Sequence, residues 1–441
     1  MKRINFLKST ADLASTSLLP STIWAFAKDG KLRTAHIGVG NMGGEDLKAI
    51  SSHAMVEVTA LCDVDANNLN AASKLHPSAK LFSDYRKMMK EISNDIDAVI
   101  VSTPDHTHAP ASMMAMNMGK PVYCQKPLTH YVSEARAMHA LAKEKNLVTQ
   151  MGIQVHSFYD YKLATLLIQS GIIGKVSMVR AWSPKNWGYD GAAPEGSDPV
   201  PETLDWNLWL GTSVERPYKE GVYHPGNWRK LMDYGCGTLG DMGVHIFDTP
   251  YNALKLDVPK TIKNNCRNPT GFGYPENNLV TYEFPATEYT TENFKWIWYD
   301  GPCAPDNHDD LILPGNEQLH DQGAMFIGEK GRLYLPHFQK LPQLIVDGEY
   351  KEMDVAKFGL GGPVRDYASE SKKHYHQFVD ACLGKDEVSA PFSYASRLTE
   401  TILLGVIAGR FPNQTLHWDN ENAKFKEEAA NKYLDGSYRD F

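Results

Sequence analysis

Short runs of β-favouring residues alternate with amphipathic stretches through the first third of the chain. The predicted strands are Thr34–Gly38, Met55–Cys62, Ala98–Ser102, Pro121–Cys124 and Leu147–Met151. The predicted helices between them include Tyr85–Ile92, Ala109–Met118 and Val132–Lys145. Strands that alternate with helices of this length are typical of a parallel sheet with crossover helices. We therefore predict an α/β domain built on a parallel sheet over residues 31–152.

The alternation stops near Gly152, and strand-like runs with a period of two take over after one helix, Tyr159–Ser170. The later predicted strands are Val176–Trp182, Leu279–Phe284, Asn293–Tyr299, Ala324–Ile327, Arg332–Leu335 and Gln343–Val346. Because these strands follow one another without helices, and Gly328–Gly331 predicts a hairpin, they indicate an antiparallel sheet. Two late helices are predicted at Tyr367–Leu383 and Tyr394–Arg410. Residues 153–441 are thus predicted to form an α+β domain with an open, mostly antiparallel sheet.

Composition and charge agree with two globular domains and exclude some functions. The chain has 441 residues, of which 42% are hydrophobic and 22% charged, as in ordinary globular proteins. A net charge of -8, without a basic run, argues against nucleic-acid binding. The six cysteines form no CxxC pair, so neither a zinc site nor a disulfide framework is expected, and no metal is predicted.

The first 30 residues have the character of a leader segment. The run Arg3–Lys8 resembles a twin-arginine export signal, although Ile4 stands where the second arginine belongs. An apolar stretch, Leu13–Ala27, ends in the small-x-small pattern of a cleavage site. It is too short and too polar to span a bilayer. We expect export to the periplasm; a cytoplasmic protein with a surface-docked leader is the alternative.

A glycine-rich motif follows the first predicted strand and precedes a helix-compatible segment, Glu45–Ser51. Its glycines allow a tight turn and close approach to a pyrophosphate, and the helix N-terminus offers unpaired N–H groups. Asp63 ends the second strand 25 positions after Gly38 (63 − 38), near the spacing of a ribose-binding acid. Because no arginine follows in residues 64–67, NAD is favoured over NADP. The predicted NAD-binding residues here are Gly38, Gly40, Asn41, Met42, Gly43 and Asp63.

The strand that ends at Ser102 runs into the turn Thr103-Pro104-Asp105-His106-Thr107-His108. Pro104 ends the strand, and Asp105 is expected to cap the helix that follows. Ligands gather at the carboxyl ends of parallel strands, so this turn is expected to line the nicotinamide pocket. The residues concerned are Thr103, Pro104, His106 and His108, and a helix-cap role is the alternative for both histidines.

The next strand ends in Gln125-Lys126-Pro127, and the segment Asp241-Met242-Gly243-Val244-His245 lies further along the chain. Together with the glycine loop, Asp63 and the Thr103–His106 turn, these motifs resemble the Gfo/Idh/MocA family, the glucose-fructose oxidoreductase and inositol dehydrogenase group. The resemblance covers nearly the whole chain after about residue 32. The family usually has Glu-Lys-Pro where this chain has Gln125. Loss of that neighbouring carboxylate should lower the pKa of Lys126.

Lys126, Asp241 and His245 are the predicted catalytic residues. A lysine that closes an apolar strand at the cofactor cleft can hydrogen-bond a substrate hydroxyl and stabilise a developing alkoxide, and it is also predicted to touch the cofactor. Asp241 and His245 are four positions apart (245 − 241), which places both on one helical face. A carboxylate beside an imidazole orients it and raises its basicity, as a general base requires. The resemblance implies that these two positions hold the family's catalytic Asp and His.

Further residues are candidates for substrate contact. Two polar residues follow the last strand of the first domain, and several aromatic residues in the loop-rich region offer a platform on which a sugar ring can stack. Packing in the core is the alternative for each of them. These candidates are Gln154, His156, Trp182, Trp187, Tyr189, Trp228 and Arg229.

The function predicted from these features is NAD-dependent oxidation of a secondary hydroxyl of a sugar or glycoside. An alternative is NAD-dependent glycoside hydrolysis, in which transient oxidation and elimination release the aglycone with no net redox change. A third interpretation is a non-catalytic binding protein that retains the fold. The resemblance also implies a homo-dimer or homo-tetramer.

Overall fold

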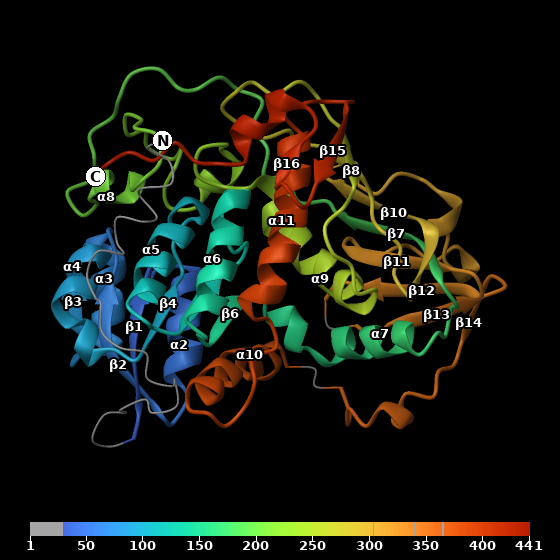
Figure 1. Ribbon diagram of the computed structural model, residues 1–441, viewed down its shortest axis with the longest axis horizontal. Helices are drawn as coiled ribbons and strands as arrows, with labels where there is room; N and C mark the ends of the chain where they lie inside the picture. The colour runs from blue at the N-terminus through green and yellow to red at the C-terminus, as the bar shows by residue number, and fades with distance from the viewer. Residues whose placement is uncertain (1–29, 303, 339, 364–365) are drawn as a thin grey trace.

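The computed structural model describes residues 30–441 except 303, 339 and 364–365. Two sheet-based halves lie side by side, with helices between them (Figure 1). The predicted leader falls on residues 1–29, which lie outside the described residues, so export stays a prediction, as does assembly into dimers or tetramers. Within the described residues, no helix combines the length and apolar character needed to cross a membrane.

The N-terminal half is a six-stranded parallel sheet with strand order β3-β2-β1-β4-β5-β6. Its strands are β1 (Leu32–Ile37), β2 (Val56–Cys62), β3 (Lys80–Phe82), β4 (Ala98–Val101), β5 (Val122–Gln125) and β6 (Thr149–Gly152). The helices are α2 (Met42–Ser51), α3 (Ala66–Leu75), α4 (Tyr85–Ile92), α5 (Asp105–Asn117) and α6 (Val132–Glu144). The predicted parallel α/β fold is confirmed. The sequence pattern missed β3 and α3, because β3 has three residues and α3 buries only Ala72.

The C-terminal half contains a ten-stranded sheet, ordered β14-β13-β12-β11-β7-β10-β9-β8-β15-β16. Its longer strands are β7 (Val176–Ser183), β8 (Thr261–Asn265), β9 (Asn278–Glu283), β10 (Thr290–Asp300), β11 (Gly323–Gly328) and β12 (Gly331–Pro336). The shorter ones are β13 (Gln343–Val346), β14 (Glu349–Lys351), β15 (Thr415–Asp419) and β16 (Lys424–Phe425). Neighbouring strands run antiparallel except β7 and β10, which are parallel. The predicted, mostly antiparallel sheet is confirmed, and Gly328 pairs with Gly331 in the predicted hairpin.

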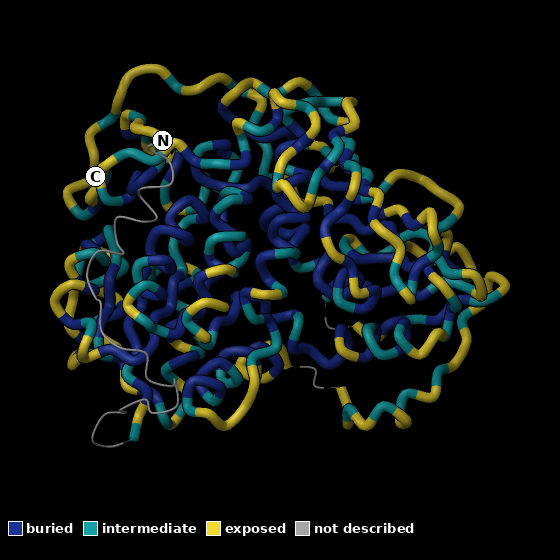
Figure 2. Tube along the Cα trace, viewed as in Figure 1, coloured by how far each residue is buried: buried dark blue, intermediate teal, exposed yellow. Residues whose placement is uncertain are grey.

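Strand β7 separates the two faces of this sheet. Val179 and Ala181 point to the main core, which includes residues of α7 (Tyr159–Gln169), α9 (Val244–Ala253) and α11 (Phe392–Ala408). Because successive side chains of a strand alternate, Trp182 points to the other face, where it joins a separate cluster with residues of the 301–322 segment. Figure 2 shows buried residues, in dark blue, inside both halves, and one core cluster includes residues of both.

One late helix crosses back to the first half. Helix α10 (Tyr367–Cys382) packs against α2 and shares a core cluster with Leu47 and Ile50 (Figure 1). The ring of Tyr375 stacks on that of Tyr123, with centroids 5.3 Å apart. A boundary at residue 152 therefore divides the sequence into two halves. It does not divide the packing, because residues of α10, which come from beyond this boundary, complete one face of the first sheet.

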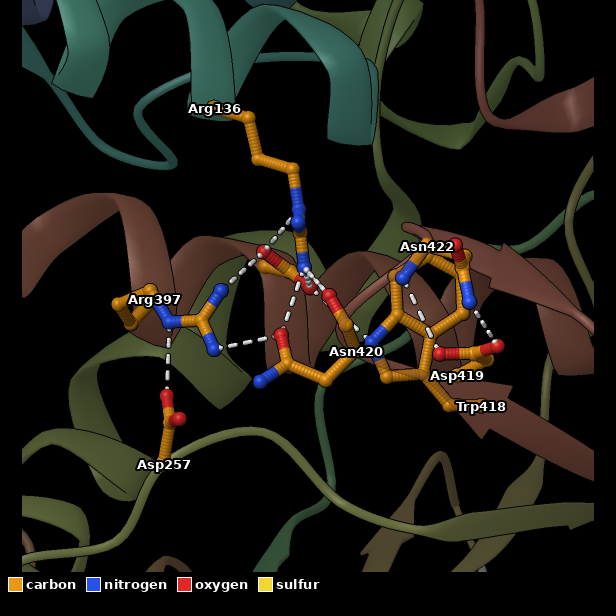
Figure 3. A network of polar contacts seen from close by, with 8 residues as sticks. Arg136, Asp257, Arg397, Trp418, Asp419, Asn420 and Asn422 are labelled. Carbon is orange, nitrogen blue, oxygen red and sulfur yellow. Dashed lines mark hydrogen bonds and ion pairs between the residues drawn. The ribbon is translucent and has the colours of Figure 1, made fainter.

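A polar network joins α6 of the first half to α11 of the second (Figure 3). Its centre is the fully buried carboxylate of Glu400. Arg136 donates two hydrogen bonds to it, at 2.6 and 2.9 Å, and Arg397 donates a third at 2.9 Å. The indole of Trp418 on β15 donates at 3.1 Å. A buried carboxylate needs such partners to remain charged, so this network fixes how α6 and α11 meet.

We expect Arg136→Met to lower the free energy of unfolding by about 2 kcal/mol, because Glu400 then keeps only part of its charge compensation. Urea denaturation followed by tryptophan fluorescence measures the change. Lys143→Met, at an exposed position of the same helix, is the matched control and should change stability by less than about 0.5 kcal/mol. Equal urea midpoints for both variants would contradict this account of the network.

Candidate active site

The glycine loop between β1 and α2 forms one wall of a cavity. Gly38 has φ +81°, and a Cβ there would lie 2.5 Å from the carbonyl oxygen of Ser102. A Cβ on Gly43 would lie 2.3 Å from the carbonyl oxygen of Gly38. Only glycine permits this packing, which places the N-terminus of α2, the positive end of the helix dipole, beside the cavity. Five predicted loop residues line the cavity: Gly38, Gly40, Asn41, Met42 and Gly43.

Asp63 follows β2 and lines the same cavity. Its Oδ2 accepts a hydrogen bond from the Val39 amide, and its Oδ1 accepts one from the Asp65 amide, each at 2.9 Å. Burial raises the pKa of Asp63, although these hydrogen bonds oppose the shift. Each oxygen retains a second lone pair, so the carboxylate can brace the glycine loop and still accept ribose hydroxyls.

A segment from the C-terminal half covers the cavity; we call residues 203–229 the cover segment. The backbone carbonyl of Thr203 accepts a hydrogen bond from the Ala66 amide at 2.8 Å, and the Asp205 amide donates to Val64 at 2.9 Å. His224 Nε2 lies 3.0 Å from Asp65 Oδ2. These contacts attach the cover segment to residues 64–66, which directly follow Asp63, the predicted ribose-binding acid. Its cavity-lining residues are Leu208, Trp209, His224, Pro225, Gly226, Trp228 and Arg229.

A buried ion pair joins the two halves at one end of this cavity. Lys126 follows β5, and its Nζ lies 2.7 Å from Oδ1 of Asp241, which lies in a π-type turn (Leu239–Gly243) just before α9. Arg229 Nη1 lies 3.3 Å from the same oxygen, and the Trp187 indole donates to Oδ2 at 2.7 Å. Burial alone would raise the pKa of Asp241, but Lys126 and Arg229 outweigh it and hold that pKa far below its usual range. Asp241 is therefore ionised.

His245 lies at the start of α9, close to this pair. Burial lowers the pKa of His245 well below its ordinary value, and the charge of Lys126 adds to the effect. Its Nδ1 is buried without a hydrogen-bond partner in the described part of the chain. The sequence predicted that Asp241 orients this imidazole. Instead, both oxygens of Asp241 are engaged by Lys126 and Trp187, so Asp241 positions the lysine and acts on His245 only through its charge.

Gln125 belongs to a second buried network behind the lysine. Its Nε2 donates to both oxygens of Asp46 at 2.9 Å, and the Ser102 and Tyr375 hydroxyls donate to the same carboxylate at 2.6 and 2.7 Å. Burial raises the pKa of Asp46 to about 6. Burial lowers the pKa of Lys126, and the charge of Asp241 opposes this shift. The predicted effect of losing a carboxylate at position 125 stays a prediction. In this structure Gln125 is hydrogen-bonded to a carboxylate of α2.

The turn after β4 differs from its prediction. His106 is buried, and its ring nitrogens lie 3.3 and 3.0 Å from the backbone carbonyls of Tyr234 and Trp209; it does not line the cavity, so its cofactor role is wrong. His108 borders the cavity, but its ring nitrogens lie 2.8 Å from two backbone carbonyls. Asp105 does not cap α5, because the helix begins at Asp105 itself. Its two preceding residues in the turn, Thr103 and Pro104, line the cavity.

The predicted substrate residues divide into two groups. Three of them line the cavity: Trp187, Trp228 and Arg229. Trp182 does not, because strand alternation turns it to the far face of the sheet, where it is fully buried and donates to the His320 carbonyl at 3.0 Å. Tyr189 packs edge-on against Phe272 outside the cavity lining.

Gln154 and His156 also lie away from the cavity lining. The amide of Gln154 donates to the Tyr375 hydroxyl at 2.8 Å, which makes it part of the Asp46 network. His156 Nδ1 lies 2.9 Å from Asp248. Both side chains hold η2 (Gln154–Ser157) against later elements, Gln154 against α10 and His156 against α9. A pattern along one segment cannot reveal such contacts.

The residues present fit a dinucleotide. Besides the glycine cradle and Asp63, two buried oxygens at the cavity have no partner within the described residues: Thr103 Oγ1 and Asp105 Oδ1. Sequence reasoning missed several lining residues, Asn68, Ser83, Tyr85, His224, Pro225 and Gly226, which carry no recognisable motif. In the described part of the chain, no group of three or more His, Cys, Asp or Glu side chains could hold a metal.

Comparison with known proteins identifies both halves. The model of the Gfo/Idh/MocA oxidoreductase family, NAD-binding Rossmann fold, matches residues 32–153, and that of the family's C-terminal alpha/beta domain matches residues 161–269. Inositol 2-dehydrogenase of Salmonella typhimurium is 30% identical over 151 residues, or 34% of this chain and 44% of that protein. A glycosyl hydrolase family 109 protein of Stenotrophomonas maltophilia is 35% identical over 136 residues, 28% of this chain and 29% of that protein. The chain thus matches less than half the length of these curated relatives.

A solved structure shares the whole fold. Levoglucosan dehydrogenase in complex with NADH and levoglucosan superposes with a TM-score of 0.62 at 17% identity, covering 88% of this chain and 99% of that one. At this identity the likeness establishes the fold. Together with the family model, it makes the N-terminal half an NAD-binding Rossmann domain.

We expect Asp63→Ala to weaken NAD binding at least about tenfold, because a charged hydrogen-bond acceptor for the ribose is lost. Loss of the negative charge should also reduce discrimination against NADP. Titration of both nucleotides, followed by tryptophan fluorescence, measures the two affinities. Glu57→Ala, an exposed change on the same strand, is the control. Unchanged NAD affinity in Asp63→Ala would remove Asp63 from the cofactor site.

Proposed function

Because the chain belongs to the Gfo/Idh/MocA family of NAD-binding oxidoreductases, we propose that it oxidises a secondary hydroxyl of a sugar, polyol or glycoside. The observation that carries this proposal is the buried Lys126–Asp241 pair, 2.7 Å apart, whose lysine lines the cofactor cavity. His245 does not line the cavity, but it is neutral and lies within the influence of both charges. The inositol dehydrogenase relative supports the substrate class.

Lys126 and His245 act on the same substrate hydroxyl, Lys126 on its oxygen and His245 on its proton. Bound NAD supplies the acceptor for the hydride that leaves the carbinol carbon. The Lys126 ammonium donates a hydrogen bond to the hydroxyl oxygen and stabilises the negative charge that develops there. His245 takes the hydroxyl proton on its imidazole, since burial keeps the ring neutral. Asp241 holds the ammonium in place and offsets its burial.

The cover segment completes the site around these groups. It places the Arg229 guanidinium 4.5 Å from the ring centroid of Trp228 and within reach of Asp241. With Trp187 on the other side of Asp241, this arrangement offers aromatic surface and a cation to a polyhydroxylated ring. It also excludes water, which strengthens the charge of Lys126 at the reacting oxygen.

Replacement of either central residue should separate chemistry from cofactor binding. We expect His245→Ala and Lys126→Ala to cut turnover of sugars or polyols by at least about 10²-fold, because each removes a group that acts in the transition state. NAD affinity should stay within a few-fold of wild type. NADH formation and NAD titration measure the two effects, and Lys90→Ala on exposed α4 is the control. Turnover that survives in both variants would overturn the assignment.

A second candidate function follows from the way the cavity is covered. Residues 203–229 are fastened across it by two backbone hydrogen bonds and the His224–Asp65 contact, which favours retention of the cofactor between turnovers. A retained cofactor suits a cycle in which the sugar is oxidised two carbons from the glycosidic carbon, so that the C–H bond on the carbon between them becomes acidic. Loss of that proton eliminates the aglycone, water adds to the resulting double bond, and the ketone is then reduced again. The family 109 relative supports this alternative.

Incubation with an aryl glycoside, without added NAD, distinguishes the two functions. If the redox-neutral cycle operates, aglycone accumulates beyond one equivalent per enzyme while NADH does not accumulate. His245→Ala should abolish this release, because the same hydroxyl must be deprotonated first. Release limited to one equivalent, with NADH formed in proportion, supports the dehydrogenase.

A further inference from the structure

Asp105 is a buried carboxylate that the proposed chemistry leaves unused. It is the first residue of α5, is 3% exposed and lines the cofactor cavity. Its Oδ1 is buried and has no hydrogen-bond partner among the residues that the structure describes. A buried polar atom without a partner costs free energy, so native folds rarely keep one unless a ligand or a bound water satisfies it.

The surroundings of Asp105 hold it beside the reacting end of the cavity. Lys126 and Arg229 act on it as neighbouring positive charges, the Cys236 thiol hydrogen-bonds it, and Asp241 repels it. The cations Lys126 and Arg229 therefore lie near two carboxylates, those of Asp105 and Asp241, so that positive and negative charges nearly balance. Asp241 is fully engaged by its partners, whereas Asp105 keeps an oxygen free.

We propose that Asp105 is a ligand-binding residue of this site, and that its free Oδ1 accepts a hydrogen bond from a hydroxyl group of the bound molecule. The hydroxyl belongs either to the nicotinamide ribose of the cofactor or to the sugar substrate. The cofactor source depends only on NAD binding by the Rossmann domain, whereas the sugar source rests on the proposed function. Thr103 Oγ1, the other unpartnered oxygen of this turn, faces the same ligand.

The carboxylate also gives ligand binding a dependence on pH. Burial raises the pKa of Asp105 to about 6, while Arg229, Lys126 and the Cys236 thiol favour the charged form and Asp241 opposes it. Above that pH the group is ionised and is a strong acceptor; below it the group is protonated and a weaker acceptor. Ligand affinity should therefore fall as the pH decreases through about 6.

The test compares wild type with Asp105→Asn, which keeps the shape of the side chain but not its charge. If the hydroxyl is that of the ribose, the Kd for NAD rises about tenfold or more at pH 8. If it is that of the sugar, the Kd for NAD is unchanged and the KM for myo-inositol or levoglucosan rises by a similar factor at nearly constant kcat. The loss of affinity below pH 6 should disappear in the variant.

Two further variants control for a folding defect and for the loss of a carboxylate outside the site. Asp105→Ser, a smaller polar replacement without charge, should show the same loss and guards against a folding defect specific to Asp105→Asn. Asp95→Asn, on an exposed carboxylate before β4, is the control and should change neither constant. The proposal is overturned if Asp105→Asn and Asp105→Ser both fold and bind NAD and sugar as the wild type does, with the same pH profile. NAD binding is measured without turnover, so this outcome is distinct from a failure of the dehydrogenase assignment.

Discussion

The ion pair between Lys126 and Asp241 is the contact on which the site depends. It joins the carboxyl end of β5 in the Rossmann domain to the turn before α9 in the second domain, across 2.7 Å. Burial opposes both charges, and each remains because the other is present. The pair therefore fixes the relative position of the halves at the point where a substrate would meet the cofactor. The site therefore needs side chains from both halves.

Much of this arrangement could be predicted from local sequence signals. The parallel sheet, the glycine loop and the antiparallel second sheet follow from periodicity and turn chemistry, which act over a few residues. The prediction of Asp63 as a cofactor residue rests on the fixed distance at which a strand places it from the glycine loop, and Asp63 does line the cavity. The family resemblance indicates Lys126, Asp241 and His245. Of these three, Lys126 lines the cavity, Asp241 pairs with it, and His245 is affected by its charge.

The rest depends on contacts between distant segments. The sequence suggests Trp182 as a residue for substrate contact, with core packing as the alternative, because it is aromatic and precedes the loop-rich region. The alternation of side chains along β7 turns it to the face of the sheet away from the main core, where it is buried in a separate cluster. Asp46 of α2 binds the amide of Gln125, the position at which the family usually has a glutamate, and this contact depends on tertiary packing. Similarly, α10 completes the first domain from more than 200 positions away, which no pattern along the chain indicates.

The account's central claim is that a carbon-bound hydrogen of a sugar is transferred to NAD at the Lys126–His245 site. Both candidate functions require this step, whether the cofactor then leaves or is reoxidised in place. The direct measurement is mass spectrometry of the reduced cofactor, recovered from protein that is denatured while it turns over a fully deuterated sugar or glycoside. Deuterium on the nicotinamide ring of the reduced cofactor from wild-type protein, and no deuterated cofactor from His245→Ala, is the predicted result. Conversion of the substrate with a reduced cofactor that carries no deuterium would contradict the claim.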